Sequence, residues 1–411
     1  MKIFNRKLKI TSSALLILCM VFVMTACAEN SSQSEKSQPA EQTTVQPTTM
    51  SAEEINDRKL DEFISDMTLE EKVGQMFFVR CPDKDAVQQV SEYNIGGYIL
   101  FGRDFDGKTK DEVVDDIHSY QNEADIPLLI GVDEEGGTVV RVSSNPNLRE
   151  TPFLSPKDTY ADGGWDAVKQ DAEEKADLLL SLGINVNLAP VCDMTSDEYG
   201  FMYDRSFSSD VDMENRYVRT VVETSRSKKL GTVLKHFPGY GNNSDTHTGI
   251  AYDDRDYSEF ENTDFKPFYQ GIESGADCIL VSHNIVNCMD SEYPASLSQK
   301  VHDILRNEFK FDGVIMTDDL IMDAITDFTE DEAAAVTAAK CGNDLLCCSS
   351  VDTQYPAVLE AVQNGEIPET QVDASVKRIL KWKQNLGIFN IDTYQKKVKS
   401  TEPTDTVGSE E

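Results

Sequence analysis

The stretch KHFPGYGNNSDTH, which begins at Lys235 and ends at His247, concentrates groups that could carry out acid–base chemistry. An apolar run, residues 232–234, leads into Lys235 and His236, and a proline and two glycines separate these from Asp245 and His247. This order predicts a buried strand that delivers the first pair to its end, and then a loop that presents the second pair. An Asp and a His two residues apart on a loop can form a dyad, in which the carboxylate orients the imidazole and tunes its proton affinity.

A second group of acids follows another mainly apolar run. Asp318 and Asp319 come directly after residues 313–317, which are typical of a buried strand. A carboxylate at the end of one strand can attack an electrophilic carbon, while an imidazole on the loop of another strand donates and then accepts a proton. The two segments together suggest a displacement site built from two residues.

The elements that must position these groups alternate between short apolar runs and longer amphipathic segments. The apolar runs are hydrophobic on both faces, as expected of parallel strands that are covered by helices. Eight such runs occupy residues 74–79, 97–101, 128–133, 185–191, 232–237, 278–283, 313–317 and 344–348. Helical patterns occupy residues 110–123, 166–182, 214–229, 298–309, 331–340 and 376–386. Eight strand–helix units predict an α/β fold with a single closed (β/α)8 barrel of the TIM type.

An open, doubly wound sheet is the competing architecture. It would need a glycine-rich phosphate loop after its first strand, and the sequence MFFVRC at residues 76–81 is not such a loop. In a barrel the reacting groups should lie at the carboxyl ends of the strands. Polar residues do end or directly follow the apolar runs there: Asp133, Glu134, Asp193, Lys235, His236, His283, Asp318 and Asp319. Any one of them could instead begin a solvated loop, but their recurrence favours a shared site.

Residues 1–26 are interpreted as an export signal. Four basic residues precede a short apolar stretch, residues 14–24, which is too short for a stable membrane span. The small residues before Cys27 resemble a bacterial lipobox, which implies cleavage before Cys27 and attachment of lipid to its sulfur. Ordinary cleavage beside an incidental cysteine, or retention of the stretch as an anchor, are the alternatives. The expected location is the extracytoplasmic face of the cell membrane, through the lipid anchor.

The rest of the chain divides by composition. Residues 27–58 are rich in Ser, Gln, Thr, Pro and Glu, which predicts a disordered tether after the lipidated Cys27. Residues 59–390 carry the strand–helix pattern and are expected to form the one catalytic domain. Residues 391–411 are polar and charged, so we expect a flexible tail.

Charge and cysteine content narrow the classes of partner. The 411 residues have a formal net charge of −35, which excludes a general nucleic-acid binder and disfavours anionic partners. A neutral substrate fits this balance better, although solubility alone could explain it. The nine cysteines show no spacing typical of a metal site, and no metal or organic cofactor is expected. A disulfide is compatible with an exported chain but is not assigned by the sequence.

Several motifs together resemble glycoside hydrolase family 3, in its bacterial β-N-acetylglucosaminidase (β-hexosaminidase) branch. KHFPG at 235–239 with DTH at 245–247 resembles the family signature, and TDDLIM at 317–322 resembles the nucleophile segment. Further similar segments are MTLEEKVGQ at 67–75, GGYILF at 96–101, DEEGG at 133–137, NLAPV at 187–191 and RSF at 205–207. The resemblance spans the whole predicted domain.

The resemblance implies roles for individual residues. Asp318 would attack the anomeric carbon in a retaining mechanism, with Asp319 as a structural neighbour. His247 would protonate the leaving oxygen and later activate water, while Asp245 orients it. Contacts with the substrate are implied for Asp133, Arg205, Lys235 and His236. His283 would either line the pocket or cap the sixth strand.

The chain departs from the family pattern around the site. Tyr240 stands where the family usually has His, and residues 242–243 are Asn-Asn in place of Asp-Thr. Thr246 replaces Ser within the dyad, and Thr138 replaces Arg after the Glu-Gly-Gly segment. These changes bear on the substrate more than on the reaction.

The sequence thus predicts an exported, lipid-anchored glycosidase that removes terminal β-linked N-acetylhexosamine from glycans or cell-wall fragments through a covalent glycosyl-enzyme intermediate. Its partners would be that carbohydrate and the membrane, without nucleic acid. A β-glucosidase, a β-xylosidase or a glycoside phosphorylase of the same family are alternatives. A non-catalytic glycan-binding lipoprotein is the alternative from another class.

Overall fold

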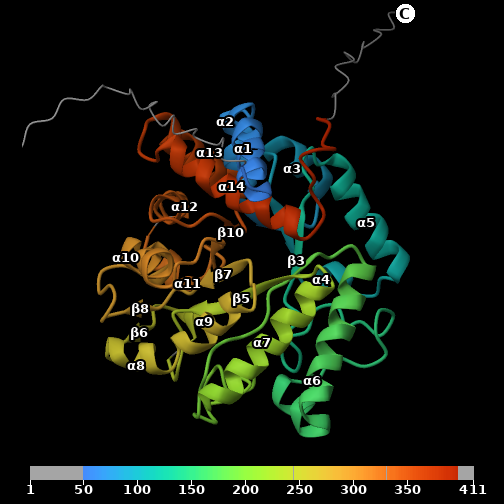
Figure 1. Ribbon diagram of the computed structural model, residues 1–411, viewed down its shortest axis with the longest axis vertical. Coiled ribbons are helices and arrows are strands. Elements are labelled where there is room, and N and C mark those ends of the chain that lie inside the picture. Colours follow the sequence, from blue (N-terminus) through green and yellow to red (C-terminus); the bar gives the residue numbers. More distant parts are fainter. Residues whose placement is uncertain (1–49, 244, 330, 397–411) are drawn as a thin grey trace, which may run out of the picture. The chain divides into compact units, whose positions relative to one another are not determined.

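Eight parallel strands form the central sheet of the computed structural model, and helices surround them (Figure 1). The structure describes residues 50–243, 245–329 and 331–396. The predicted signal, most of the predicted tether and the end of the predicted tail lie outside these residues.

The strands follow one another around the sheet in the order β10-β1-β2-β3-β4-β5-β7-β9. Their bounds are β1 (Phe77–Arg80), β2 (Gly97–Leu100), β3 (Leu129–Val132), β4 (Val186–Asn187), β5 (Gly231–Phe237), β7 (Cys278–Val281), β9 (Val314–Thr317) and β10 (Leu346–Cys348). A parallel bridge between Met316 and Leu345 joins the two ends, and the Thr317 hydroxyl accepts a hydrogen bond from the Cys347 backbone at the same join. The fold is a (β/α)8 barrel of the TIM type, and all eight predicted strands are confirmed.

A second, two-stranded parallel sheet pairs β6 (Tyr252–Asp253) with β8 (Ile285–Val286), and the sequence did not predict it. The helices are α1 (Ala52–Ser65), α2 (Leu69–Gln75), α3 (Ala86–Tyr93), α4 (Gly102–Phe105), α5 (Lys110–Glu123), α6 (Pro156–Ser181), α7 (Val211–Ser227), α8 (Tyr257–Asn262), α9 (Phe265–Glu273), α10 (Gln299–Asp303), α11 (Asp323–Thr326), α12 (Asp331–Lys340), α13 (Val351–Gln363) and α14 (Glu369–Asn385). Short 3-10 turns η1 (Thr246–Thr248) and η2 (Ala295–Leu297) and a π-helical turn η3 (Ile304–Glu308) complete the fold.

Apolar alternation along the strands separates the barrel interior from the layer beneath the helices. Phe78, Ile99, Val233 and Met316 belong to the interior cluster, whereas their chain neighbours pack against helices. Side chains on a strand point to opposite faces with a period of two. The same alternation therefore aims Asp133, Lys235 and Asp318 inward, because each follows an interior residue by an even number of positions. At the opposite end of the barrel, Ile379 and Trp382 of α14 join the interior cluster.

The folded region begins earlier than predicted. Ser51 caps α1, because its hydroxyl accepts from the Glu54 backbone at 3.1 Å while the Glu54 carboxylate accepts from the Ser51 backbone at 2.7 Å. Such a capping box satisfies two backbone donors that a helix start otherwise leaves unpaired. Residues 52–58 thus belong to a helix, which corrects the prediction that the tether extends to residue 58.

The start of the predicted tail is also part of the fold. Tyr394 packs edge-on against Phe63 of α1 with ring centroids 5.0 Å apart, and Ile391 contacts the same apolar cluster. Lys59 pairs with Asp392 at 2.5 Å. Residues 391–396 are therefore packed against α1, which corrects the prediction of a flexible segment from residue 391.

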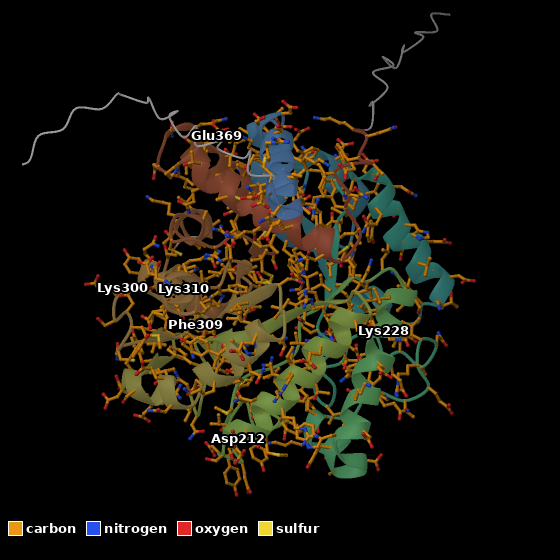
Figure 2. The ribbon with its side chains drawn as sticks, in the orientation of Figure 1. Asp212, Lys228, Lys300, Phe309, Lys310 and Glu369 are labelled. Carbon is orange, nitrogen blue, oxygen red and sulfur yellow. The ribbon has the colours of Figure 1, made fainter. Side chains whose placement is uncertain are left out.

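Lys228, Lys300 and Glu369 are examples of charged side chains at the periphery of the ribbon (Figure 2). Of the seven cysteines that the structure describes, six are buried, only Cys288 is exposed, and all are free thiols. Within the described residues, no helix is both long and apolar enough to cross a membrane.

Candidate active site

A cavity of about 620 Å³ opens at the carboxyl ends of the strands. Its lining includes six of the predicted site residues: Asp133, Arg205, Lys235, His236, His247 and Asp318. The volume lies within the range of small-molecule pockets. Strand ends from distant parts of the sequence thus come together around one space. Asp245, the remaining predicted catalytic residue, contacts His247 from outside this lining.

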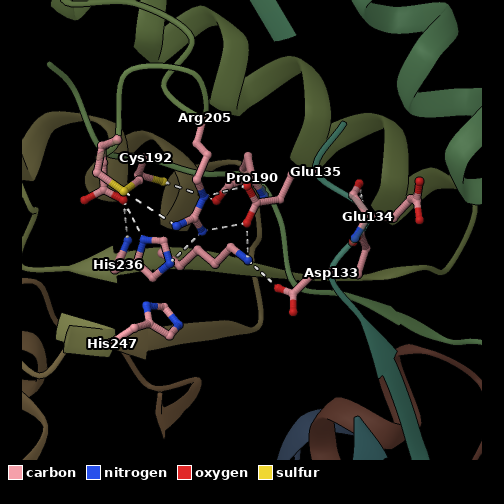
Figure 3. A network of polar contacts seen from close by, with 12 residues as sticks. Asp133, Glu134, Glu135, Pro190, Cys192, Arg205, His236 and His247 are labelled. Atoms are coloured by element: carbon pink, nitrogen blue, oxygen red, sulfur yellow. Dashed lines mark hydrogen bonds and ion pairs between the residues drawn. The ribbon is translucent and has the colours of Figure 1, made fainter. Parts of the chain in front are cut away.

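A chain of ion pairs runs along one wall of the cavity (Figure 3). The Lys235 ammonium lies 2.6 Å from both Asp133 Oδ1 and Glu135 Oε1. Arg205 donates two parallel hydrogen bonds to Glu135, from Nε to Oε2 at 2.9 Å and from Nη2 to Oε1 at 2.8 Å. A bidentate pair of this kind fixes the orientation of the Glu135 carboxylate and stabilises its charge. The wall therefore presents a rigid array of charged groups.

The charges in this wall stabilise one another. Burial alone would raise the pKa of Glu135, but Arg205 and Lys235 hold it well below its usual range. Burial would likewise lower the pKa of Lys235, but Asp133 and Glu135 outweigh it and the pKa is raised. Glu135 and Lys235 are thus held in their charged forms, and the side chains of the wall need no reorientation to bind neutral hydroxyl groups.

His236 extends the wall at the end of β5. Its Nδ1 lies 2.7 Å from Asp193 Oδ2, and its Nε2 lies 3.1 Å from Arg205 Nη2. Because a guanidinium can only donate, Nε2 accepts and Nδ1 carries the proton that it donates to Asp193. The pairing of β5 with β7 shifts between Leu234 and Phe237. Such an irregularity re-aims side chains, so that Lys235 and His236 both reach the cavity although they are adjacent.

Asp318 and Asp319 lie at the end of β9 in different surroundings. Burial raises the pKa of Asp318, but His283, His236 and His247 together with the Asp319 backbone N–H lower it overall. The Asp319 N–H donates to Asp318 Oδ1 at 2.9 Å. The Asp319 carboxylate accepts from Ser349 at 2.6 Å, and burial raises its pKa. Asp318 is thus held as an anion against the cavity, while the bonds of Asp319 hold its loop in place.

His283 lies beneath this loop and is fully buried. Its Nε2 donates to the Asp319 carbonyl at 3.0 Å, and its Nδ1 accepts from the Ser296 hydroxyl at 2.7 Å. Burial lowers the pKa of His283, which favours the neutral ring, and the two hydrogen bonds fix its tautomer. Of the two roles left open for His283, the contacts favour support of the strand end.

The dyad residues Asp245 and His247 flank Thr246 in the loop after β5. His247 Nδ1 lies 2.7 Å from Asp245 Oδ1, and the His247 backbone N–H donates to the same oxygen at 2.9 Å. The two side chains are 57% and 27% exposed for His247 and Asp245 respectively. Phe201 packs edge-on against the His247 ring with centroids 6.1 Å apart. The imidazole therefore stands at the rim, where a departing group and incoming water can both reach it.

Several cavity residues were not predicted from the sequence. Glu135 is the centre of the ion-pair wall, although only its place in the DEEGG motif marked it. Arg80, Phe101, Arg141 and Phe201 also line the cavity. Arg80 ends β1 and Phe101 follows β2, so both could have been found from strand ends. Phe201 and Arg141 lie on loops, where the pattern of the sequence carries no such signal.

The described residues offer no group of three or more His, Cys, Asp or Glu side chains that could hold a metal ion. The groups that the cavity and its rim present are a carboxylate, an imidazole–carboxylate pair and a wall of fixed charges.

Comparison with known proteins places these features in a family. The model of the glycosyl hydrolase family 3 N-terminal domain matches residues 68–382. A β-hexosaminidase of Nitrosomonas eutropha is 32% identical over 273 residues, which cover 64% of this chain and 77% of the relative. A β-hexosaminidase of Haemophilus influenzae is 29% identical over 302 residues, which cover 70% and 81%.

Solved structures agree in fold. A family 3 β-N-acetylglucosaminidase from Paenibacillus sp. superposes with a TM-score of 0.74 at 29% identity, over 84% of this chain. This chain spans just under two thirds of that protein, 66% of its length. A β-N-acetylhexosaminidase from Beutenbergia cavernae has a TM-score of 0.71 at 25% identity, and the match covers 78% of this chain and 99% of that one.

Proposed function

This chain belongs to glycosyl hydrolase family 3, and from that premise we propose that it is a β-N-acetylhexosaminidase. It is a glycoside hydrolase that acts on carbohydrate, and its substrates are glycans or cell-wall fragments that end in β-linked N-acetylglucosamine. The observation that carries this proposal is the single cavity that Asp318, His247 and the ion-pair wall share.

In the first step, an oxygen of Asp318 attacks the anomeric carbon of the terminal sugar. The bond from that carbon to the glycosidic oxygen breaks, and its electron pair stays on the leaving oxygen. His247 donates its Nε2 proton to this oxygen while Asp245 accepts a hydrogen bond from Nδ1. The products are the free leaving group and a glycosyl ester on Asp318.

In the second step, water attacks the anomeric carbon of the ester. His247 removes a proton from the water, the ester bond breaks, and Asp318 returns to a carboxylate. Two inversions give net retention, as in hydrolases that use a carboxylate nucleophile. An imidazole in place of the second carboxylate avoids a further negative charge beside the ester.

The wall supports this chemistry by holding the sugar. Asp133, Lys235, Arg205 and His236 present acceptors and donors that are already bonded and oriented. Because these side chains are already fixed, binding the hydroxyl groups of the sugar costs them little further entropy, and the contacts hold the anomeric carbon in line with Asp318.

The activity can be tested with chromogenic β-glycosides that do or do not carry the 2-acetamido group, in phosphate and in phosphate-free buffer. We expect colour release only from the acetamido sugars, with free N-acetylglucosamine as the product in both buffers. A sugar 1-phosphate in phosphate buffer would instead identify a phosphorylase. If no glycoside releases colour, the result would contradict the proposal that the protein is an enzyme.

The nucleophile can be assigned with a matched pair of variants. Asp318→Asn should lower kcat on the order of 10³-fold or more while the protein still binds N-acetylglucosamine. Asp319→Asn should still form the covalent ester with a slow fluorinated glycoside, and mass spectrometry should locate that ester on Asp318. An ester on any other residue would contradict the assignment.

We also propose that lipid on Cys27 anchors the enzyme to the outer face of the cell membrane. The small residues before Cys27 and the basic and apolar segments that precede them support this proposal. Cys27→Ser should move the protein from the membrane fraction to the soluble fraction. An unchanged membrane fraction would contradict lipidation.

A further inference from the structure

Tyr240 connects the dyad to buried residues behind the cavity wall. It lies just after β5, only 1% exposed, and its hydroxyl shares a hydrogen bond with the Thr246 hydroxyl. Thr246 is the residue between Asp245 and His247, and it is the buried member of the η1 turn. The hydrogen bond therefore reaches the centre of the dyad turn from below, while the two dyad side chains face the rim.

The backbone and ring of Tyr240 are held by Asp193 and His236, which lie beside the ion-pair wall. Its backbone N–H donates to Asp193 Oδ1 at 2.7 Å, and the second oxygen of Asp193 holds His236. The Tyr240 ring packs edge-on against His236 at 5.3 Å and against Phe201 at 5.9 Å between centroids. Backbone, ring and hydroxyl of Tyr240 are thus all fixed, so the hydroxyl offers the turn a stationary partner.

Glycines with positive φ angles flank Tyr240. Gly239 and Gly241 have φ angles of 119° and 53°, and they pack closely against Asp264 and Arg255 respectively, so the start of the loop is held in place. Gly249, just after the dyad, has a φ of 137°. A catalytic acid on such a loop needs a contact that sets its position, because general acid catalysis depends on the distance to the leaving oxygen.

Given the proposed function, we infer that Tyr240 is a positioning residue for the acid–base dyad: its hydroxyl bond to Thr246 sets where His247 stands over the cavity. Burial raises the pKa of Tyr240, so its hydroxyl keeps its proton throughout the pH range of the reaction. Loss of the hydroxyl leaves the Thr246 oxygen buried without this partner, which favours turn positions that bring it to water.

The role predicts a specific kinetic signature in Tyr240→Phe. Proton donation matters most when the leaving group is a weak acid, and little when it is a strong one. With 4-methoxyphenyl N-acetyl-β-glucosaminide we expect kcat/KM to fall about tenfold or more, because general acid catalysis contributes about 10²- to 10⁴-fold in all. With the 2,4-dinitrophenyl glycoside we expect a change of less than about twofold, because that phenolate leaves without a proton.

Three companion variants separate positioning from loss of stability. Thr246→Val removes the other hydroxyl and should reproduce the leaving-group dependence of Tyr240→Phe, whereas Thr246→Ser keeps a hydroxyl and should restore most of the rate. Tyr98→Phe is the matched control. Tyr98 lies on β2 and is also buried, and its hydroxyl donates to the Ala86 carbonyl at 2.7 Å. Tyr98→Phe should leave the dependence on the leaving group unchanged.

Equal losses with both glycosides, or no loss with either, would overturn the role of Tyr240. So would a Thr246→Ser variant that resembles Thr246→Val. If the wild type cleaves neither glycoside, the proposed function itself fails. If the wild type cleaves both, but Tyr240→Phe lowers kcat/KM equally for the two glycosides, only the role of Tyr240 fails.

Discussion

Arg205 shows how much of the site depends on the shape of one side chain. Its planar guanidinium donates to both oxygens of Glu135 and, at 3.1 Å, to His236. A lysine would keep the charge but offers a single ammonium without this forked geometry. The orientation of Glu135 and His236 therefore depends on the fork as well as on the charge.

Arg205→Lys should lower kcat/KM for an aryl N-acetylglucosaminide by about tenfold or more, because each hydrogen bond to a charged group contributes about 1.5–3 kcal/mol. Steady-state kinetics measure the change. Arg216→Lys is the control. The Arg216 guanidinium stacks on the Trp165 ring, with its central carbon 4.3 Å from the ring centroid, and Arg216 does not line the cavity. Equal kcat/KM for wild type and Arg205→Lys would show that the fork is not needed.

At the residue scale, the sequence located the groups that directly follow an apolar strand. Asp133, Lys235 and Asp318 were found in this way, because strand alternation aims them inward. Glu135 was not, because its partner Arg205 lies 70 residues away and only the fold brings the two together. The position of His283 under the Asp319 carbonyl likewise depends on a contact between strand ends.

At the scale of the elements, α14 buries a lysine at the closed end of the barrel. Lys383 is fully buried, and its Nζ donates to Gln75 Oε1 at 2.7 Å. Burial lowers the pKa of Lys383 to about 7, from an ordinary value of 10.5. Between these two values the unfolded chain binds a proton that the folded chain does not, so this group makes the free energy of unfolding rise with pH.

Lys383→Met should remove that rise. Between pH 7 and pH 9 the stability of the wild type, relative to the variant, should increase by up to about 1.4 kcal/mol for each pH unit. Urea unfolding at several pH values measures this difference. Gln75→Leu removes the same hydrogen bond but keeps the amine, so it should retain the rise; a constant difference between wild type and Lys383→Met would refute the argument.

The sequence located the barrel strands and the bounds of some helices, but it missed the breaks within others. The bounds of α5 and α12 match the predicted ranges. The predicted helix at 166–182 is only the second part of α6, whose backbone is not helical at Gly163 and Gly164. The predicted helix at 298–309 divides into α10 and a π-helical turn.

At the scale of the whole molecule, the folded unit extends beyond its predicted limits at both ends. Helix α1 lies against α14 through Asn56 with Gln384 and Asp57 with Lys381. Composition hid this start, because Ser51 and the acids after it resemble the tether before them. The capping pattern of Ser51 and Glu54 was the available signal.

A chain of residues 51–396 should therefore match the full-length protein in melting temperature and in kcat/KM. A chain of residues 59–390 should melt several degrees lower, at roughly 2 °C for each kcal/mol of lost contacts. Its kcat/KM at 25 °C should be preserved, because the cavity lies at the other end of the barrel. Calorimetry and activity assays measure both, and equal melting temperatures would contradict the revised limits.

The open position of His247 also affects what the enzyme can make. In the proposed mechanism, once the sugar is esterified to Asp318, the vacated side of the cavity faces the His247 ring, which is more than half exposed. Water reaches the ester by that route, and so does any small alcohol or second sugar present at high concentration. Such acceptors would be activated by the same imidazole and joined to the sugar with its configuration kept. A catalyst of this shape is expected to transfer sugars as well as release them, and its product mixture will depend on the solution around it.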